Sequence, residues 1–259
     1  MKSAGATQPI IFINLLTTYP HNAFFRPPAR PAGIKFFTFT PMGYSNTEEN
    51  YIKAIYHLSE DEGETISTNS IAKSVNATAA SVTDMLKKLK EKKLITYEKY
   101  QGVRLTKEGE KIAKNIVRKH RLWEVFLVEK LGYSWDKIHD IAEQLEHIRS
   151  EEMIDKLDKF LGYPKFDPHG DPIPDALLNI KAVKQTVLSK LKTGDKGKVV
   201  GVKDSSSKLL QHLDDLEIKL GTEIEILDVI EFDESVVVKI GKNKKATLSK
   251  LAAQNVFIG

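Results

Sequence analysis

The sequence predicts a mainly α-helical protein with a winged helix-turn-helix near its start and a small all-β barrel at its end. Apolar residues recur with helical spacing from about residue 45 to residue 162. Two short β-type runs interrupt this pattern after the third helix, in the order typical of a winged helix-turn-helix. From Thr193 onward, apolar and polar residues alternate with period two and glycines separate the runs, which indicates a small barrel.

The composition is that of a globular protein. The chain has 259 residues, 41% of them hydrophobic and 29% charged, which is enough for two or three small domains. It contains no cysteine, so disulfides and thiolate metal sites are excluded and any metal must use nitrogen and oxygen ligands. No apolar run approaches the ~20 residues of a membrane helix. We therefore expect a cytoplasmic protein without a membrane partner.

The first 43 residues differ from the rest of the chain. Five prolines from Pro20 to Pro41 break any regular element. We interpret residues 1–43 as a disordered arm, or as an extension upstream of a true start near Met42.

The winged helix-turn-helix is expected to begin with a helix that starts at Ser45 or Thr47. Two glutamates in its first turn suit the helix dipole, and Gly63 ends the segment. The elements that follow are a short helix, a longer helix and two strands, over Ser70–Val75, Thr78–Lys93, Leu94–Tyr97 and Val103–Leu105.

Two long helices are expected next, from Thr106 or Lys107 to about Lys130 and from about Ser134 past Asp158 to Gly162. The apolar positions of the second helix cover an arc wider than one small domain needs, which indicates a dimer interface. Residues 164–174 form a proline-rich loop, in which we interpret His169 as a loop residue rather than a ligand. Residues 175–192 are expected to form a connecting helix or tether. The barrel is expected to consist of four strands and one short helix, over Lys198–Val202, Glu223–Leu227, Val236–Ile240, Lys245–Leu248 and Leu209–Leu216.

The second helix of the helix-turn-helix has the features of a DNA-reading helix. Hydroxyl side chains on its exposed side can bond phosphates or base edges, and small alanines let that end enter a major groove. Basic residues on this helix and on the wing supply phosphate contacts. Lysines on a surface helix also occur without DNA, and winged helices also bind proteins, so this pattern alone leaves both alternatives open. The candidate DNA-binding residues are Thr78, Ala79, Ala80, Ser81, Thr83, Lys87, Lys99 and Arg104.

Two sets of acidic and histidine residues indicate metal binding. Glu143, Glu146 and His147 have i, i+3, i+4 spacing, which places them on one face of the expected helix. Two carboxylates and an imidazole suit a divalent first-row metal. His120 and Glu124 have i, i+4 spacing on the preceding helix, and the following helix adds His139. Surface ion pairing explains any one pair, whereas the six residues together favour metal.

Several stretches resemble the family of the diphtheria toxin repressor and the manganese transport regulators, over roughly residues 44–174 and more loosely to Gly259. The matching stretches are Asn50–Tyr56, Ser81–Thr83, Leu105–Gly109, Arg118–Leu122, Glu146–His147 and Asp171–Pro174.

The resemblance implies a domain order and two metal sites. The segments are a winged helix-turn-helix domain over 44–112, a helical dimerisation and metal-binding domain over 113–175, a linker over 176–192 and an SH3-like, FeoA-type domain over 193–259. The implied regulatory site consists of Glu143, Glu146, His147 and Asn50, where Asn50 is a weaker ligand than the Asp or Met more common in the family. The implied ancillary site consists of His120, Glu124 and His139, with Asp204 as the candidate from the barrel.

The implied function is that of a metal-dependent repressor, which binds palindromic operator DNA as a homodimer and controls metal-uptake genes. A ligand set without sulfur favours Mn²⁺ and leaves Fe²⁺ open. One alternative is a metal-independent winged-helix DNA-binding or scaffold protein. A dinuclear-metal enzyme is less favoured, because no histidine has a glutamate three residues before it, as helical-bundle enzymes of that kind require.

Overall fold

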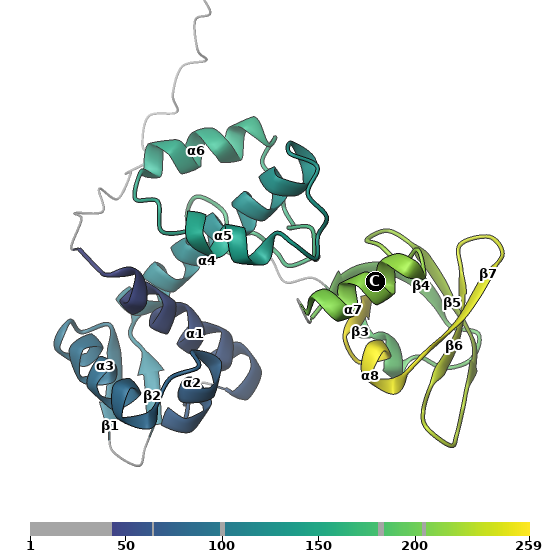
Figure 1. The fold of residues 1–259 in the computed structure, drawn as a ribbon, viewed down its shortest axis with the longest axis horizontal. Helices are drawn as coiled ribbons and strands as arrows, with labels where there is room; N and C mark the ends of the chain where they lie inside the picture. Colours follow the sequence, from purple (N-terminus) through teal and green to yellow (C-terminus); the bar gives the residue numbers. More distant parts are fainter. Residues whose placement is uncertain (1–42, 64, 99–101, 181–183, 204–205) are drawn as a thin grey trace, which may run out of the picture. The chain divides into compact units, whose positions relative to one another are not determined.

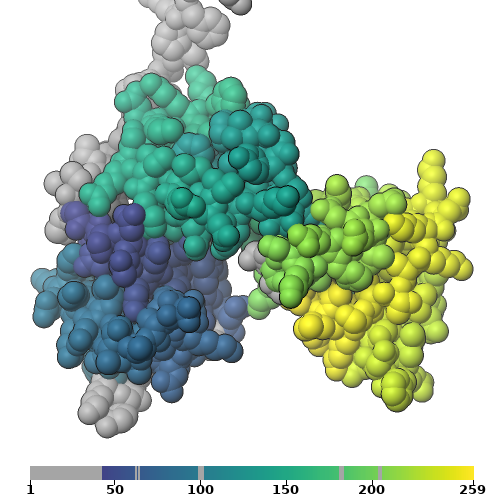
Figure 2. Space-filling view, viewed as in Figure 1, coloured from purple at the N-terminus to yellow at the C-terminus, as the bar shows by residue number. Residues whose placement is uncertain are grey.

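The computed structural model describes residues 43–63, 65–98, 102–180, 184–203 and 206–259. The predictions for residues 1–42, Lys99 and Asp204 lie outside these ranges. The described chain forms a winged helix-turn-helix, a helical domain and a β-barrel, in that order (Figure 1). In the space-filling view, residues close in sequence, and therefore similar in colour, lie in the same region of the surface, as expected for domains that are contiguous in sequence (Figure 2). The predicted fold class is therefore confirmed.

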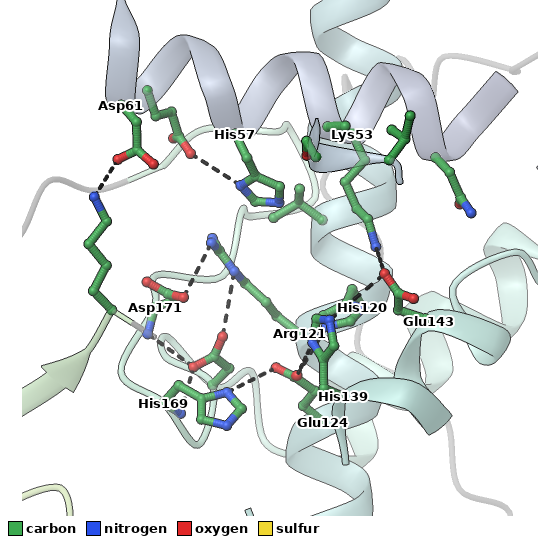
Figure 3. Close-up of a pocket in the computed structure, with 18 of the residues that line it drawn as sticks. Lys53, His57, Asp61, His120, Arg121, Glu124, His139, Glu143, His169 and Asp171 are labelled. Atoms are coloured by element: carbon green, nitrogen blue, oxygen red, sulfur yellow. Dashed lines mark hydrogen bonds and ion pairs between the residues drawn. The ribbon is translucent and has the colours of Figure 1, made fainter. Parts of the chain in front are cut away.

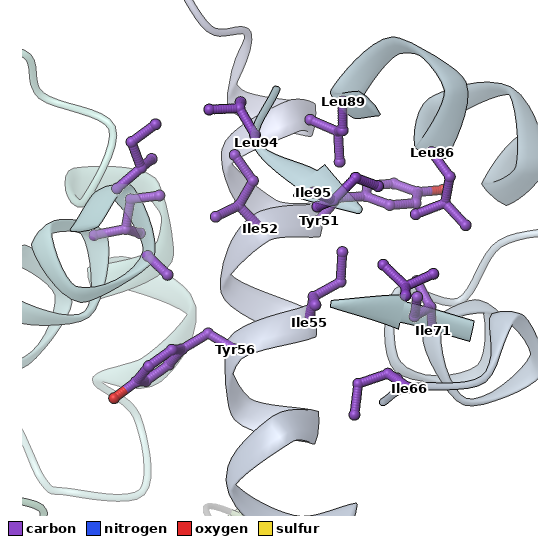
Figure 4. Packing of buried hydrophobic residues seen from close by; sticks show 14 of the residues in the cluster. Tyr51, Ile52, Ile55, Tyr56, Ile66, Ile71, Leu86, Leu89, Leu94 and Ile95 are labelled. Atoms are coloured by element: carbon purple, nitrogen blue, oxygen red, sulfur yellow. The ribbon is translucent and has the colours of Figure 1, made fainter. Parts of the chain in front are cut away.

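The winged domain begins with a helix whose start is set by its first residues. Ser45 and Glu48 form a capping box, in which each side chain bonds the other residue's backbone N–H. Tyr51, Ile52 and Ile55 then face a buried core, which the second and third helices and the strands complete (Figure 4). The elements are α1 (Asn46–Glu62), α2 (Thr68–Ser74), α3 (Ala79–Glu91), β1 (Ile95–Glu98) and β2 (Gly102–Leu105), and the two strands pair antiparallel.

The helical domain corrects one prediction. The long helix α4 (Lys107–Glu129) agrees with the expectation, but two shorter helices, α5 (His139–Leu145) and α6 (Glu151–Phe160), replace the single helix expected from Ser134 to Gly162. The chain turns after α5, where Ile148 N–H bonds the Leu145 carbonyl, and Ser150 caps α6 by accepting the N–H of Met153. The apolar periodicity continued across this break and concealed it.

The described residues after 174 form no connecting helix, and the segment that we expected to be a helix or a tether up to Lys192 ends earlier. Its start forms a turn, because one carboxylate oxygen of Asp175 accepts the N–H groups of Leu177 and Asn179. Its end already belongs to the barrel as a two-residue strand and a single 3₁₀ turn, β3 (Thr186–Val187) and η1 (Leu188–Lys190).

The barrel is built on a six-stranded antiparallel sheet in the order β3-β8-β4-β5-β6-β7. Four of these strands and the helix α7 were predicted, whereas β3, β8 and the short helix α8 were missed because each is shorter than five residues. The bounds are β4 (Lys196–Val202), α7 (Ser207–Asp215), β5 (Glu223–Val229), β6 (Val236–Ile240), β7 (Lys244–Leu248), α8 (Lys250–Ala253) and β8 (Val256–Ile258).

Two contacts tie the helical domain to the barrel. Trp135, between α4 and α5, packs among the buried residues of the barrel, and its Nε1 donates to Asp214 Oδ2 at 2.9 Å. In the proline-rich loop, the carbonyl of His169 accepts the N–H of Val202 in β4 at 2.8 Å. Among the described residues, no helix combines the length and the apolar character that a membrane crossing requires.

The loop that carries His169 depends on Gly170, and this generates a first prediction. Gly170 has φ +92°, and a Cβ there would overlap with the Val200 carbonyl and the Gly201 Cα. Gly194 has the same φ, with nothing within 4 Å of a Cβ, and so provides a matched control. We expect Gly170→Ala to lower the free energy of unfolding by about 2 kcal/mol more than Gly194→Ala, measured by urea denaturation. Equal losses would show that the close approach to β4 is unimportant.

Candidate metal centre

A polar cavity of about 680 Å³ is lined by side chains from α1, α4, α5 and the proline-rich loop (Figure 3). Most of its chemistry-bearing side chains are acids and histidines. They come from three segments of the chain: two residues one turn apart on α4, the first residue of α5, and the loop that follows α6. The cavity therefore gathers residues that are up to 156 positions apart, from Thr47 to Lys203.

The first group in this cavity is the ancillary set that the sequence indicated. His120 and Glu124 lie one turn apart on α4, and His120 Nε2 is 3.0 Å from Glu124 Oε1. His139 begins α5 and places Nδ1 3.7 Å from the same carboxylate oxygen. The ligand atoms of the three residues lie within 4.8 Å of one another, which is roughly twice a metal–ligand bond. Each of the three is thus close enough to share one ion.

A second group shares Glu124. It adds Asp167 and His169 from the proline-rich loop, again with ligand atoms within 4.8 Å of one another. His169 Nδ1 is 3.6 Å from Glu124 Oε2, and its Nε2 is 3.1 Å from the Trp135 carbonyl. Sequence reasoning assigned His169 to a loop role and overlooked Asp167. No spacing rule connects either residue to Glu124, because both lie on a loop more than 40 positions further along the chain.

Burial and mutual charge shift the pKa values of this cluster. Burial alone would lower the pKa of His120, but hydrogen bonds to Glu124 and Glu146 raise it to about 9. His169 behaves likewise: Glu124 outweighs its burial and raises its pKa to about 9. Burial would raise the pKa of Glu124, yet the three histidines hold it well below its usual value. Burial and the nearby Glu124 raise the pKa of Asp167 to about 7.

The expected regulatory set is not gathered around one point. Glu143 and Glu146 both reach Lys53 on α1, whose Nζ lies 3.2 Å from Glu143 Oε1 and 2.7 Å from Glu146 Oε1. His147 faces a different partner, since its Nδ1 is 2.6 Å from Glu49 Oε2. Glu143 and Glu146 keep their i, i+3 relation, since both contact Lys53, whereas His147 lies in the turn after α5, which ends at Leu145. Asn50, the fourth residue of the expected set, lines the cavity.

Glu49 and Lys53 were missed as parts of this site. They lie one turn apart on α1 and both meet the end of α5 and the turn after it, through His147 and the two glutamates. The sequence did offer one signal for them, namely their i, i+4 spacing on the polar face of α1. The apolar face of that helix was predicted correctly. Opposite charges at that spacing usually stabilise the helix itself, and so they gave no reason to look for partners elsewhere.

The donor chemistry of the cavity fits a divalent first-row ion. Three imidazoles and two carboxylates converge without sulfur, a combination suited to Mn²⁺ or Fe²⁺. The second ring nitrogen of His120 lies 2.6 Å from Glu146 Oε2, which is the outer carboxylate contact typical of metal-binding histidines. The residues present therefore fit such an ion at Glu124, whereas the Glu143–Glu146 pair already holds an ammonium.

The candidate DNA-binding residues lie on the exposed start of α3 and on the wing. Thr78 is the N-cap of α3 and accepts the N–H of Ser81, and Thr83 donates its hydroxyl to the Ala79 carbonyl at 2.8 Å. Ala79, Ala80 and Ser81 are exposed. Lys87 pairs with Asp84, and Arg104 donates to Thr65 Oγ1 at 2.6 Å. The slim, polar N-terminal end of α3 is thus accessible, as a major-groove helix requires.

Comparisons with known proteins agree with this arrangement. Three family models match in succession: "Iron dependent repressor, N-terminal DNA binding domain" over residues 44–103, "Iron dependent repressor, metal binding and dimerisation domain" over 106–175, and "FeoA domain" over 186–259. The three ranges coincide with the winged domain, the helical domain with its cavity, and the barrel.

Individual relatives and structures point the same way. The diphtheria toxin repressor of Corynebacterium jeikeium is 33% identical over 129 residues, which is 50% of this chain and 53% of that protein. The regulator MntR of Oceanobacillus iheyensis is 38% identical over 119 residues, 46% of this chain and 80% of its own. The chain thus spans about half the length of the first of these curated relatives. A manganese-dependent transcriptional repressor in complex with manganese has a TM-score of 0.75 at 33% identity, covering 82% of this chain and 98% of its own. The manganese regulator SloR has a TM-score of 0.66 at 34% identity, with coverage of 82% and 97%.

The shifted histidines generate a prediction for the metal-free protein. Their pKa values are raised in the folded state, so their contribution to stability is complete below about pH 6.5 and is lost as the pH rises through about 9. In chelator, we expect the free energy of unfolding from urea titrations to fall steadily between pH 6.5 and pH 9.5. The surface variant His57→Asn should show the same slope. A stability that is flat or rises over this window would contradict the charged cluster.

Proposed function

Because the chain belongs to the family of iron- and manganese-dependent transcriptional repressors, we propose that it is a metal-dependent repressor that binds palindromic operator DNA as a homodimer and controls metal-uptake genes. One observation carries the proposal. Helix α1 belongs to the winged domain on its apolar side and contacts the acidic and histidine cluster of the helical domain on its polar side. Any ion that alters this cluster acts on a helix of the DNA-binding domain.

The DNA-binding part of the proposal is supported by α3. Its first turn is exposed and carries short side chains, while Val82, Leu86 and Leu89 fix its other face in the core. A helix held in this way presents its N-terminal end at a defined angle. In a dimer, two such helices reach successive major grooves when they are about one helical turn of DNA apart, and the operator then mirrors the symmetry of the protein.

The homodimer is supported by exposed apolar side chains on the helical domain. Phe160 is 64% exposed at the end of α6, and Tyr163, Met153 and Leu131 are also exposed. Large apolar side chains that are exposed on one domain are candidates for an interaction surface. Residues 106–175, which include them, match the model that describes dimerisation.

The ion is proposed to be held by His120, Glu124 and His139, with Asp167 and His169 adjoining. Bound there, a divalent ion supplies the positive charge that the buried carboxylates attract. The chain's own contribution is to bring α4, the start of α5 and the proline-rich loop to one point. Mn²⁺ is favoured by the nitrogen and oxygen ligands and by the manganese-dependent neighbours in structure, and Fe²⁺ is the alternative. A DNA-binding repressor of this kind would act in the cytoplasm.

A chain of polar contacts joins the cluster around Glu124 to α1 and indicates how metal binding would affect the DNA-binding domain. His120 bonds both Glu124 in the cluster and Glu146, and Glu146 in turn bonds Lys53 of α1. The arrangement of the cluster is therefore transmitted to α1 by two contiguous polar contacts. An ion that binds one arrangement better than others shifts the population of α1 positions, and hence the spacing of the two α3 helices.

The metal requirement is tested by operator binding. With an operator fragment selected from random DNA by the Mn²⁺-loaded protein, we expect fluorescence anisotropy to show at least about tenfold tighter binding in Mn²⁺ than in chelator. His139→Ala removes an accessible ligand and should abolish this difference. His212→Ala, on the exposed side of the barrel, should retain it. Equal affinity with and without metal would refute the proposal and favour a metal-independent DNA-binding or scaffold protein.

The DNA contact of α3 is tested by the salt dependence of binding. If Lys87 neutralises a phosphate, Lys87→Ala should weaken binding and reduce the slope of log affinity against log salt by about one. Lys156→Ala, on the exposed face of α6, should leave the slope unchanged. A slope unaffected by Lys87→Ala would exclude this residue from the interface.

A further inference from the structure

The side chain of Lys53 occupies the position at which the regulatory carboxylates would meet an ion. Its Nζ lies 3.2 Å from Glu143 Oε1, 2.7 Å from Glu146 Oε1 and 2.8 Å from Glu146 Oε2. Figure 3 shows it extending from α1 toward Glu143. We propose that Lys53 is a tethered cation that sets the ion affinity of the Glu143–Glu146 pair, because a divalent ion can use these carboxylates only after the ammonium has left. The inference rests on the proposed metal dependence of the protein.

The buried position of Glu146 explains why a cation is needed there. Its side chain is 0% exposed, and burial of an ionised carboxylate without a partner is costly. The hydrogen bond from His120 and the charge of Lys53 outweigh this burial and hold the pKa of Glu146 below its usual value. Lys53 itself is only 11% exposed. The pair is thus a built contact inside the protein and not a surface ion pair.

The ammonium and a divalent ion cannot share this place. Both oxygens of Glu146 and one oxygen of Glu143 already face Nζ within hydrogen-bonding distance. An ion bound to the same oxygens would lie next to a like charge in a partly buried site, where repulsion is weakly screened. Lys53 must therefore move before the ion binds, and the free energy of breaking its contacts is subtracted from the binding of the ion.

The structure provides a path for this movement. Lys53, Asn50 and His57 line the same cavity of about 680 Å³ on α1. The flexible stem of a lysine can swing its charged end into such a space without moving the helix. A strongly hydrated ammonium gains water there in exchange for the carboxylates. The competition can thus be reversible and local.

Lys53 also influences the second ion position through a shared carboxylate. Glu146 bonds Lys53 on one side and His120 Nδ1 on the other, while His120 Nε2 faces Glu124. Removal of the ammonium leaves Glu146 with His120 as its remaining charged partner among the contacts described. We therefore expect loss of Lys53 to lower the stability of the metal-free protein and to raise its affinity for an added divalent ion.

The test compares Lys53→Met, which keeps the length of the side chain and removes its charge, with Lys53→Arg, which keeps a charge. In calorimetric titrations of the full chain with Mn²⁺, Lys53→Met should bind an ion at least about tenfold more tightly than the wild type at one position. Lys53→Arg should bind like the wild type. The matched control is Lys156→Met, which removes an exposed lysine paired with Glu152 and should change nothing.

Two further measurements locate the effect. Adding Glu143→Gln to Lys53→Met should cancel the gain in affinity, because Glu143 belongs to the pair in question. Glu143 Oε1 also lies 3.8 Å from His139 Nε2, so Glu143→Gln in the wild-type background is measured alongside to correct for any effect on the cluster around Glu124. In chelator, the thermal midpoint of Lys53→Met should lie below that of the wild type, and Mn²⁺ should restore it. Both readouts are independent of DNA.

The inference is overturned if Lys53→Met binds Mn²⁺ no more tightly than the wild type, or if the gain survives Glu143→Gln. It is supported if the gain appears and depends on Glu143, whatever the operator assays show. The failure of the proposed function is a different result, namely operator binding that ignores metal. The two failures are therefore distinguishable.

Discussion

The buried carboxylate of Glu124 is the constraint on which the centre of this structure depends. Three histidines from α4, the start of α5 and the proline-rich loop surround it, and Asp167 adds a second acid. An ionised carboxylate in this position is tolerated only with such partners. Its neutralisation therefore requires that three separate segments remain together. Because the loop that contributes His169 also bonds β4, and Trp135 packs in the barrel, the same requirement extends to the third domain.

Helix α1 connects the charged residues of the helical domain to the core of the winged domain. One face of α1 packs in the core of the winged domain through Tyr51, Ile52 and Ile55. Another face contacts the residues around the end of α5 through Glu49 and Lys53. A close-packed core does not deform gradually, so a helix that changes its contacts on one face moves the elements packed on the other. Helix α3, the candidate DNA-reading helix, belongs to that same core through Val82, Leu86 and Leu89. Coupling between the cavity and α3 thus needs no element beyond α1.

Local patterns in the sequence predicted the fold well and the site only in part. Capping residues and apolar spacing placed α1, α3 and α4, and period two placed most of the barrel, because those signals act within a few residues. The same reasoning found His120, Glu124 and His139, whose approach needs only helical spacing and a short connection. It failed where tertiary packing decides: the break after Leu145, the arrival of Asp167 and His169, and the insertion of Lys53 between two glutamates. Each of these is a contact between segments remote in sequence, which no periodicity encodes.

The presence of Lys53 affects how the proposed metal switch of this chain would work. A ligand moves an equilibrium only by the difference between its affinities for the two arrangements. Since an ammonium already joins α1 to Glu143 and Glu146, the contact between these elements exists without metal, and an ion that merely replaced it would gain little. The larger difference is then expected around Glu124, whose carboxylate oxygens lie 3.0 Å from His120 Nε2 and 3.6 Å from His169 Nδ1 and would become ligands of the ion together with these imidazoles. An ion there displaces protons instead of a lysine. On this argument the cluster around Glu124 provides the driving force, and Lys53 limits how far the Glu143–Glu146 pair responds.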